Sequence, residues 1–106
     1  MPEAYPPGQY VKDFLNEIWP IAKAVCPAYG IDPEMCVRKA GELSRWGADA
    51  PHFNYFGFKG RGDVGTYMTL HMVMGADGTE SPRQESRAKF SSPQAAITAW
   101  CQVVGG

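Results

Sequence analysis

One carboxylate in the sequence stands in a setting that suits acid catalysis. Glu42 lies near the end of an expected helix, four residues before Trp46 and directly after Gly41, which has no side chain. A carboxyl group half-buried against an aromatic ring holds its proton near neutral pH, because desolvation disfavours the charged form. Such a group can protonate a leaving oxygen, so Glu42 is the candidate catalytic acid. The alternative interpretation is a solvated surface residue, as most helix glutamates are.

A dense aromatic group follows Glu42 in a glycine-rich stretch. Sugars present flat C–H faces that stack on aromatic rings, and a phenol hydroxyl suits a groove better than a core. Tyr55 and Tyr67 are therefore better groove candidates than Phe56 or Phe58. The alternative is that the whole group forms core and rim. Its members are Trp46, Phe53, Tyr55, Phe56, Phe58 and Tyr67.

The histidines and cysteines do not form a metal motif. His52 and His71 match no catalytic triad or metal spacing, and the cysteines form no CxxC or Cys/His pattern. We expect neither a metal ion nor another cofactor. A short loop could bring Cys26 and Cys36 within bridging distance, which would leave Cys101 free. The alternative is three buried thiols, because free cysteine is among the most buried residue types.

Length and charge narrow the class of protein. A chain of 106 residues is enough for one domain, and its net charge of −1 gives no sign of nucleic acid or an anionic membrane as partner. No apolar stretch reaches the ~20 residues that span a bilayer. Residues 1–9 are expected to be a flexible lead-in. They lack the basic and apolar regions of a signal peptide, so export would use another route unless the start has been trimmed.

Apolar residues at three- and four-residue steps predict a helix over residues 10–28, with a kink or break at Pro20. Gly30 can end it. Asp32 as cap and Pro33 at the first helical position predict a second helix that reaches residue 45. Ser92 and Pro93 likewise begin a third helix near the end of the chain.

Between the second and third helices the sequence predicts a β-hairpin. Aromatic and β-branched residues run from 64 to 73, residues 76–79 (Ala-Asp-Gly-Thr) supply the turn, and a return strand extends to about residue 90. Helices with a small β excursion describe an α+β fold, with the sheet beside a helical core.

The order of these segments resembles the bacterial glucosaminidase family, which includes flagellar peptidoglycan hydrolases, autolysins and phage lysins. The resemblance covers nearly all of the chain after Gln9, and it rests on IWPIAKAV, GELSRWG, FNYFGFKG and KFSSPQAAITAW. It implies a small lysozyme-like domain over residues 10–106, mainly helical with a β-hairpin lobe. The family places its catalytic glutamate just before a Trp-Gly or Tyr-Gly pair, which implies Glu42. Its Asn-x-Phe-Gly-x-Lys-Gly segment is matched by Asn54, Phe56, Gly57, Lys59 and Gly60.

The sequence departs from the family at two places. The family glutamate usually lies three positions before the Trp, where this chain has Leu43, whereas Glu42 lies four before it. Many members also carry a second acid on the first hairpin strand, where residues 69–72 hold none. Asp63, Asp77 and Glu80 are the nearest alternatives, and His71 is a candidate to hold water or sugar there. Catalysis assisted by the N-acetyl group of the substrate needs only one well-placed acid.

The resemblance implies a glycosidase, of N-acetylglucosaminidase or muramidase type, that cleaves β-1,4 bonds of peptidoglycan. A lytic enzyme that releases an anhydro-sugar is the chemical alternative, and an inactive peptidoglycan-binding or structural module is the alternative of another class. The expected setting is a phage lysin, or an antibacterial effector toxin secreted or delivered to a periplasm and neutralised by an immunity protein. The expected substrate-binding residues are Trp46, Asn54, Tyr55, Phe56, Tyr67 and His71.

Overall fold

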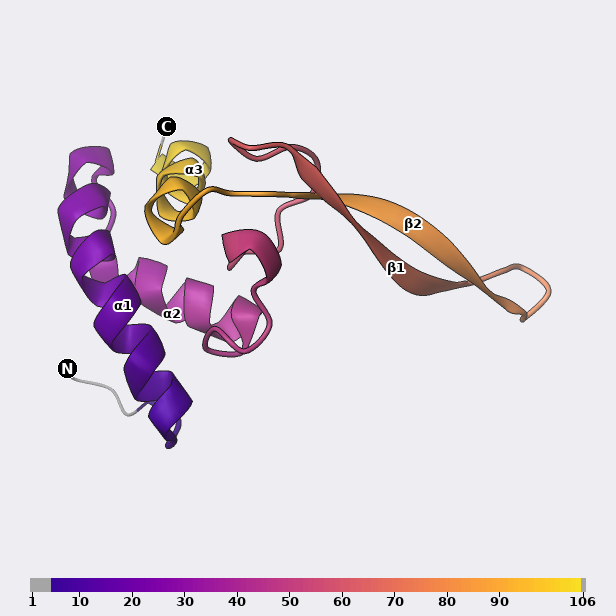
Figure 1. Ribbon diagram of the computed structural model, residues 1–106, viewed down its shortest axis with the longest axis horizontal. Helices are drawn as coiled ribbons and strands as arrows, with labels where there is room; N and C mark the ends of the chain where they lie inside the picture. The colour runs from indigo at the N-terminus through magenta and orange to yellow at the C-terminus, as the bar shows by residue number, and fades with distance from the viewer. Residues whose placement is uncertain (1–4, 106) are drawn as a thin grey trace.

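The computed structural model describes residues 5–105, in which three α-helices pack together and a long hairpin extends away from them (Figure 1). The chain measures 48 × 31 × 21 Å, and the hairpin accounts for much of the long dimension. Residues 1–4 of the expected lead-in lie outside the described residues. At the other end of the expected lead-in, Gln9 already belongs to the first helix.

Helix α1 spans Gln9–Val25 and is continuous through Pro20, so of the expected kink or break at that residue the break does not occur. Proline removes one hydrogen bond from a helix, whereas the buried side chains of Ile18 and Ala22 keep both sides of Pro20 on the core. The helix ends three residues before the expected position. Its last turn continues as a short 3₁₀ helix, η1, over Cys26–Tyr29, which ends at Gly30 with a φ of 69°.

Helix α2 spans Pro33–Ser44 and begins as expected. The Asp32 carboxylate accepts a hydrogen bond from the Glu34 N–H at 3.1 Å, which caps the first turn. Helix α3, over Pro93–Gly105, begins in the same way, because Ser92 Oγ accepts from the Ala95 N–H at 3.1 Å.

Strands β1 (Thr66–Met74) and β2 (Glu80–Ala88) pair antiparallel and form a two-stranded sheet. The turn forms at the expected residues. Gly78 adopts a φ of 84°, and the Asp77 carboxylate accepts from both the backbone and the hydroxyl of Thr79. The strands are shorter than expected, because residues 64 and 65 and residues 89 and 90 lie in the connections to the helices.

The core lies between the three helices and includes all three cysteines. Cys26 Sγ lies 3.6 Å from Cys101 Sγ, and each cysteine is a free, buried thiol. The suggested bridge between Cys26 and Cys36 is therefore not present, and the alternative of three buried thiols is confirmed. Burial raises the pKa of the Cys36 and Cys101 thiols, because the thiolate is disfavoured away from water.

No described helix is long and apolar enough to cross a membrane. Nor do residues 5–105 contain a cluster of three or more His, Cys, Asp or Glu side chains that could hold a metal ion.

Candidate functional site

A groove of about 290 Å³ lies between the C-terminal end of α2 and the base of the hairpin. We call it the hairpin groove. Its walls come from three parts of the chain: the end of α2, the turns over residues 49–57, and the two strands. The lining residues are Leu43, Asp49, Pro51, Asn54, Gly57, Tyr67, Thr69, Leu70, His71 and Arg87.

Asn54 shapes the floor of this groove by closing a turn. Its side chain is 3% exposed; its Oδ1 accepts from the Phe58 N–H and its Nδ2 donates to the Phe58 carbonyl, both at 2.9 Å. Between them, Gly57 has a φ of 65°, which favours glycine. Residues 54–60, which match the family segment, therefore contain a turn that these two hydrogen bonds close.

One face of the hairpin supplies the polar wall. Side chains alternate along a strand, so Tyr67, Thr69 and His71 share a face with Glu85 and Arg87, which pair with that region from β2. The hydroxyl of Thr69 donates to the Glu85 carbonyl at 3.4 Å. The rings of Tyr67 and His52 are in contact, tilted by 46° with centroids 4.7 Å apart.

Glu85 sits at the centre of a charged cluster on this wall. Its carboxylate lies 3.1 Å from Arg87 Nη2, 3.5 Å from His71 Nδ1 and 3.6 Å from Lys59 Nζ. Lys59 reaches it because residues 58–60 run beside β2, held by hydrogen bonds from the Ala88 N–H and to the Ser86 carbonyl. Sequence reasoning missed Glu85, because a turn at Asp77-Gly78 would place Ser86 opposite Thr69, whereas the structure pairs Thr69 with Glu85.

The structure does not place Glu42 at the floor of a groove. Glu42 is exposed on α2, and the neighbouring Leu43 lines the hairpin groove in its stead. Successive helical residues point about 100° apart, so adjacent side chains cannot share one direction. Glu42 is thus exposed instead of half-buried, and the indole of Trp46 lies against Gly41. That Glu42 is the catalytic acid stays a prediction.

The path of the chain after α2 explains the place of Trp46. Arg45 and Trp46 both adopt positive φ angles, 54° and 57°, and the chain reverses there. Ser44 ties the reversal to the helix: its hydroxyl donates to the Ala40 carbonyl at 2.6 Å and accepts from the Gly47 N–H at 3.0 Å. The Trp46 ring therefore folds back onto the helix and meets Phe14 edge-on at 5.7 Å.

The six expected substrate-binding residues do not form one surface. Asn54, Tyr67 and His71 line the hairpin groove. Trp46 and Tyr55 line a separate groove of about 270 Å³ beside α1, which we call the α1 groove. Phe56 is buried and stacks on Trp100, with centroids 5.2 Å apart, so its expected contact with substrate is replaced by a place in the core.

Tyr55 is held in the α1 groove by a carboxylate. Its side chain is 4% exposed, and its hydroxyl donates to Glu17 Oε1 at 3.2 Å. Burial, with the nearby Glu17 carboxylate, raises the pKa of Tyr55. The hydroxyl is therefore a proton-bearing donor at neutral pH, and it acts as a packing residue that is tied to α1.

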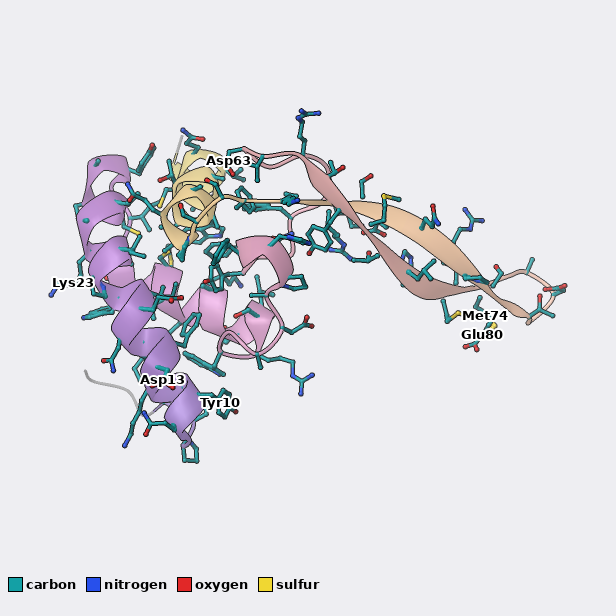
Figure 2. All side chains as sticks on the ribbon, viewed as in Figure 1. Tyr10, Asp13, Lys23, Asp63, Met74 and Glu80 are labelled. Atoms are coloured by element: carbon teal, nitrogen blue, oxygen red, sulfur yellow. The ribbon has the colours of Figure 1, made fainter. Side chains whose placement is uncertain are left out.

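The three alternative carboxylates do not line the hairpin groove. Figure 2 labels two of them, Asp63 near α3 and Glu80 at the far end of the hairpin. Asp63 accepts from the backbone N–H and hydroxyl of Ser91 near the start of α3, and these hydrogen bonds lower its pKa. Asp77 is bonded within the hairpin turn, and its pKa is lowered by Thr79. Glu80 begins β2 at the outer end of the hairpin.

Solved structures of peptidoglycan hydrolases share this architecture. The catalytic domain of the autolysin Auto from Listeria monocytogenes matches 95% of the chain with a TM-score of 0.77 and 22% identity. A truncated glycoside hydrolase domain of FlgJ from Salmonella typhimurium matches 90% with a TM-score of 0.72 and 19% identity. A peptidoglycan hydrolase from Sphingomonas sp. A1 matches 90% with a TM-score of 0.68 and 19% identity.

The chain spans 59%, 68% and 62% of the lengths of these three chains, respectively. No family model matches the sequence, and neither does any curated protein. The described chain therefore has the small α+β, lysozyme-like fold of these peptidoglycan hydrolase domains.

Proposed function

We propose that the chain is a peptidoglycan glycosidase that binds glycan strands in the hairpin groove and cleaves β-1,4 bonds between N-acetylated sugars. The observation that carries this proposal is the likeness of nearly the whole chain to an autolysin catalytic domain and a glycoside hydrolase domain. The hairpin groove supports it, because amide, hydroxyl and charged groups on a partly aromatic wall suit a polar sugar chain.

Cleavage requires a proton for the leaving oxygen. Glu42 is the candidate that the sequence supplies, and its replacement by Gln tests that role directly. The groove lining adds three further groups that can carry a transferable proton, Asp49, Tyr67 and His71. A mechanism in which the substrate's own N-acetyl group attacks the sugar carbon needs no second carboxylate.

The proposal is tested with purified protein and purified peptidoglycan. Clearing of a peptidoglycan zymogram and release of new reducing ends are expected, and mass spectrometry of the products identifies the bond that is cut. A reducing N-acetylglucosamine end indicates a glucosaminidase, a reducing N-acetylmuramic acid end indicates a muramidase, and an anhydro-sugar indicates lytic transglycosylation. Absence of all three kinds of product would contradict the proposal.

A second candidate is an inactive peptidoglycan-binding module, and one observation favours it. Leu43 occupies the helix position that faces the hairpin groove, while Glu42 faces solvent. A protein that sediments with insoluble peptidoglycan but releases no fragment would establish this candidate, since fold alone does not prove activity.

As to setting, the proposed glycosidase fits a phage lysin or an effector toxin delivered to a rival's periplasm. Expression in a bacterium with and without an added export signal distinguishes cell-wall action from other toxicity. We expect lysis only when the chain reaches the periplasm. Co-purification from the producer then tests for an immunity or inhibitor protein that covers the groove.

A further inference from the structure

The lining of the hairpin groove contains few groups able to deliver a proton. Leu43 stands where α2 faces the groove, and Asp63, Asp77 and Glu80 lie outside it. Among the lining residues, Asp49, Tyr67 and His71 carry or can carry a transferable proton. Of these, His71 is the one in contact with a carboxylate, which lies 3.5 Å from its Nδ1.

We propose that His71 is the catalytic proton donor of the hairpin groove and that Glu85 is its positioning residue. The inference rests on the proposed glycosidase function. It places proton donation on the β-hairpin instead of on α2, and it gives Glu85, which no sequence pattern indicated, a role in the reaction.

The geometry fixes which imidazole nitrogen is used. The side chain of His71 is 46% exposed at the groove, whereas that of Glu85, its diagonal neighbour on the paired strand, is 21% exposed. Because the Glu85 carboxylate faces Nδ1, a hydrogen there stays on the protein side and Nε2 is the nitrogen left for a ligand. In the protonated ring both nitrogens carry hydrogen, so Nε2 can donate while Glu85 stabilises the imidazolium.

Glu85 is itself held in place from several directions. Arg87 and Lys59 approach the same carboxylate oxygen, Oε1, whereas His71 approaches Oε2. Arg83 is the register partner of His71 on β2, and Asp49 lines the groove from the turn after α2. Within residues 5–105, these are the charged groups that the ion pairs, the strand register and the groove lining place near His71. They leave Oε2 directed at the imidazole, which limits ring rotation.

In the proposed reaction, the substrate itself supplies the nucleophile that completes the step. His71 Nε2 gives its proton to the bridging oxygen as the bond from that oxygen to C1 breaks and its electron pair moves to the oxygen. The N-acetyl carbonyl oxygen of the same sugar forms the new bond to C1. Water then attacks C1 and gives a proton to the neutral imidazole, while the acetamide is restored and the imidazolium is regenerated.

Chemical rescue provides the sharpest test. His71→Ala removes a half-exposed ring at the groove, so added imidazole can enter the space from solvent. We expect kcat for reducing-end release to fall at least ~10²-fold, as for loss of a general acid, with glycan affinity within twofold of the unmodified chain. Added imidazole should restore the rate in proportion to its concentration. Gln84→Ala, on the opposite face of β2, is the matched control with unchanged rate.

The role of Glu85 is tested by a graded pair. Glu85→Gln should lower kcat about tenfold with KM unchanged, and Glu85→Asp should recover part of the loss, because a carboxylate is again present. Near-normal cleavage by His71→Ala, or a loss that imidazole does not rescue, overturns the proposal while the glycosidase function stands. So does a loss confined to Asp49→Asn or Glu42→Gln. If the unmodified chain never cleaves glycan, the proposed function and this inference fall together.

Discussion

The six-membered ring of Trp46 lies so close to the α-carbon of Gly41 that a β-carbon at position 41 would overlap it. In most exposed helix positions, Gly→Ala stabilises a protein by up to about 1 kcal/mol. At position 41 we expect the opposite effect on stability. Gly41→Ala should lower the free energy of unfolding by about 1–3 kcal/mol, as overpacking does, in urea denaturation.

The same substitution made in a Trp46→Ala background isolates the cause. With the ring removed, Gly41→Ala should become neutral or stabilising. An equal loss in both backgrounds would contradict the contact as the cause.

A carboxyl group placed at position 43 should increase cleavage. Leu43 is 53% exposed and lines the hairpin groove, so a glutamate there faces the bound strand without entering the core. We expect Leu43→Glu to raise the rate of reducing-end release about tenfold, less than the ~10²–10⁴-fold of general acid catalysis, because the groove already contains the proton donor proposed above. Leu43→Gln has the same size and no acid, and its rate should not rise. Equal rates for the two variants would show that position 43 does not approach the scissile bond.

Loss of the Asn54 side chain should unfold the turn that it closes. Asn54→Ala leaves the N–H and carbonyl of Phe58 without their partners, and it should cost roughly 2–3 kcal/mol for two buried hydrogen bonds. Asn54→Asp keeps the acceptor and loses the donor, so an intermediate loss is expected by thermal denaturation. A loss below about 0.5 kcal/mol for Asn54→Ala, the level of an ordinary surface substitution, would contradict this role.

The buried thiols should make the fold sensitive to alkali. Burial, with Cys26 beside it, raises the pKa of Cys101 to about 12. An unfolded cysteine ionises near pH ~8.5, so between these values only the unfolded chain releases the proton. The contribution of the neutral thiol to the free energy of unfolding is therefore fully present below pH ~8.5, and it declines as the pH rises toward 12.

We expect the free energy of unfolding to fall between pH 9 and 11, with a limiting slope of about 1.4 kcal/mol per pH unit for each such thiol. Cys101→Ala should have a smaller slope, whatever its stability at pH 7. Identical slopes for the two proteins would assign the alkaline loss to other groups, such as Tyr55, whose pKa is also raised.

The helices could be predicted from the sequence because their signals are local. Asp32, Pro33 and Ser92 act within one turn of the helix that they begin, and Gly30 ends the preceding segment through its own backbone angles. The hairpin turn was equally accessible, since Asp77 and Gly78 carry its hydrogen bonds and its positive φ.

The functional site was harder to predict from the sequence, because it depends on backbone angles and strand pairings that local composition does not reveal. Arg45 and Trp46 adopt a left-handed backbone that is uncommon outside glycine, and after this reversal the indole lies against Gly41. Glu85 meets His71 only through the strand register, fourteen positions along the chain. The resemblance to the family predicted the correct fold. Which face of α2 meets the groove could be seen only in the structure.

The closeness of Cys26 to Cys101, 75 positions apart, also determines when the molecule can fold. Helix α3 lies against α1 and η1 and supplies Ile97 and Trp100 to a core whose other walls are made much earlier in synthesis. Closing so long a loop loses chain entropy before any contact compensates for it. During synthesis, the parts of the α1 and η1 surface that α3 covers therefore stay exposed until α3 has left the ribosome.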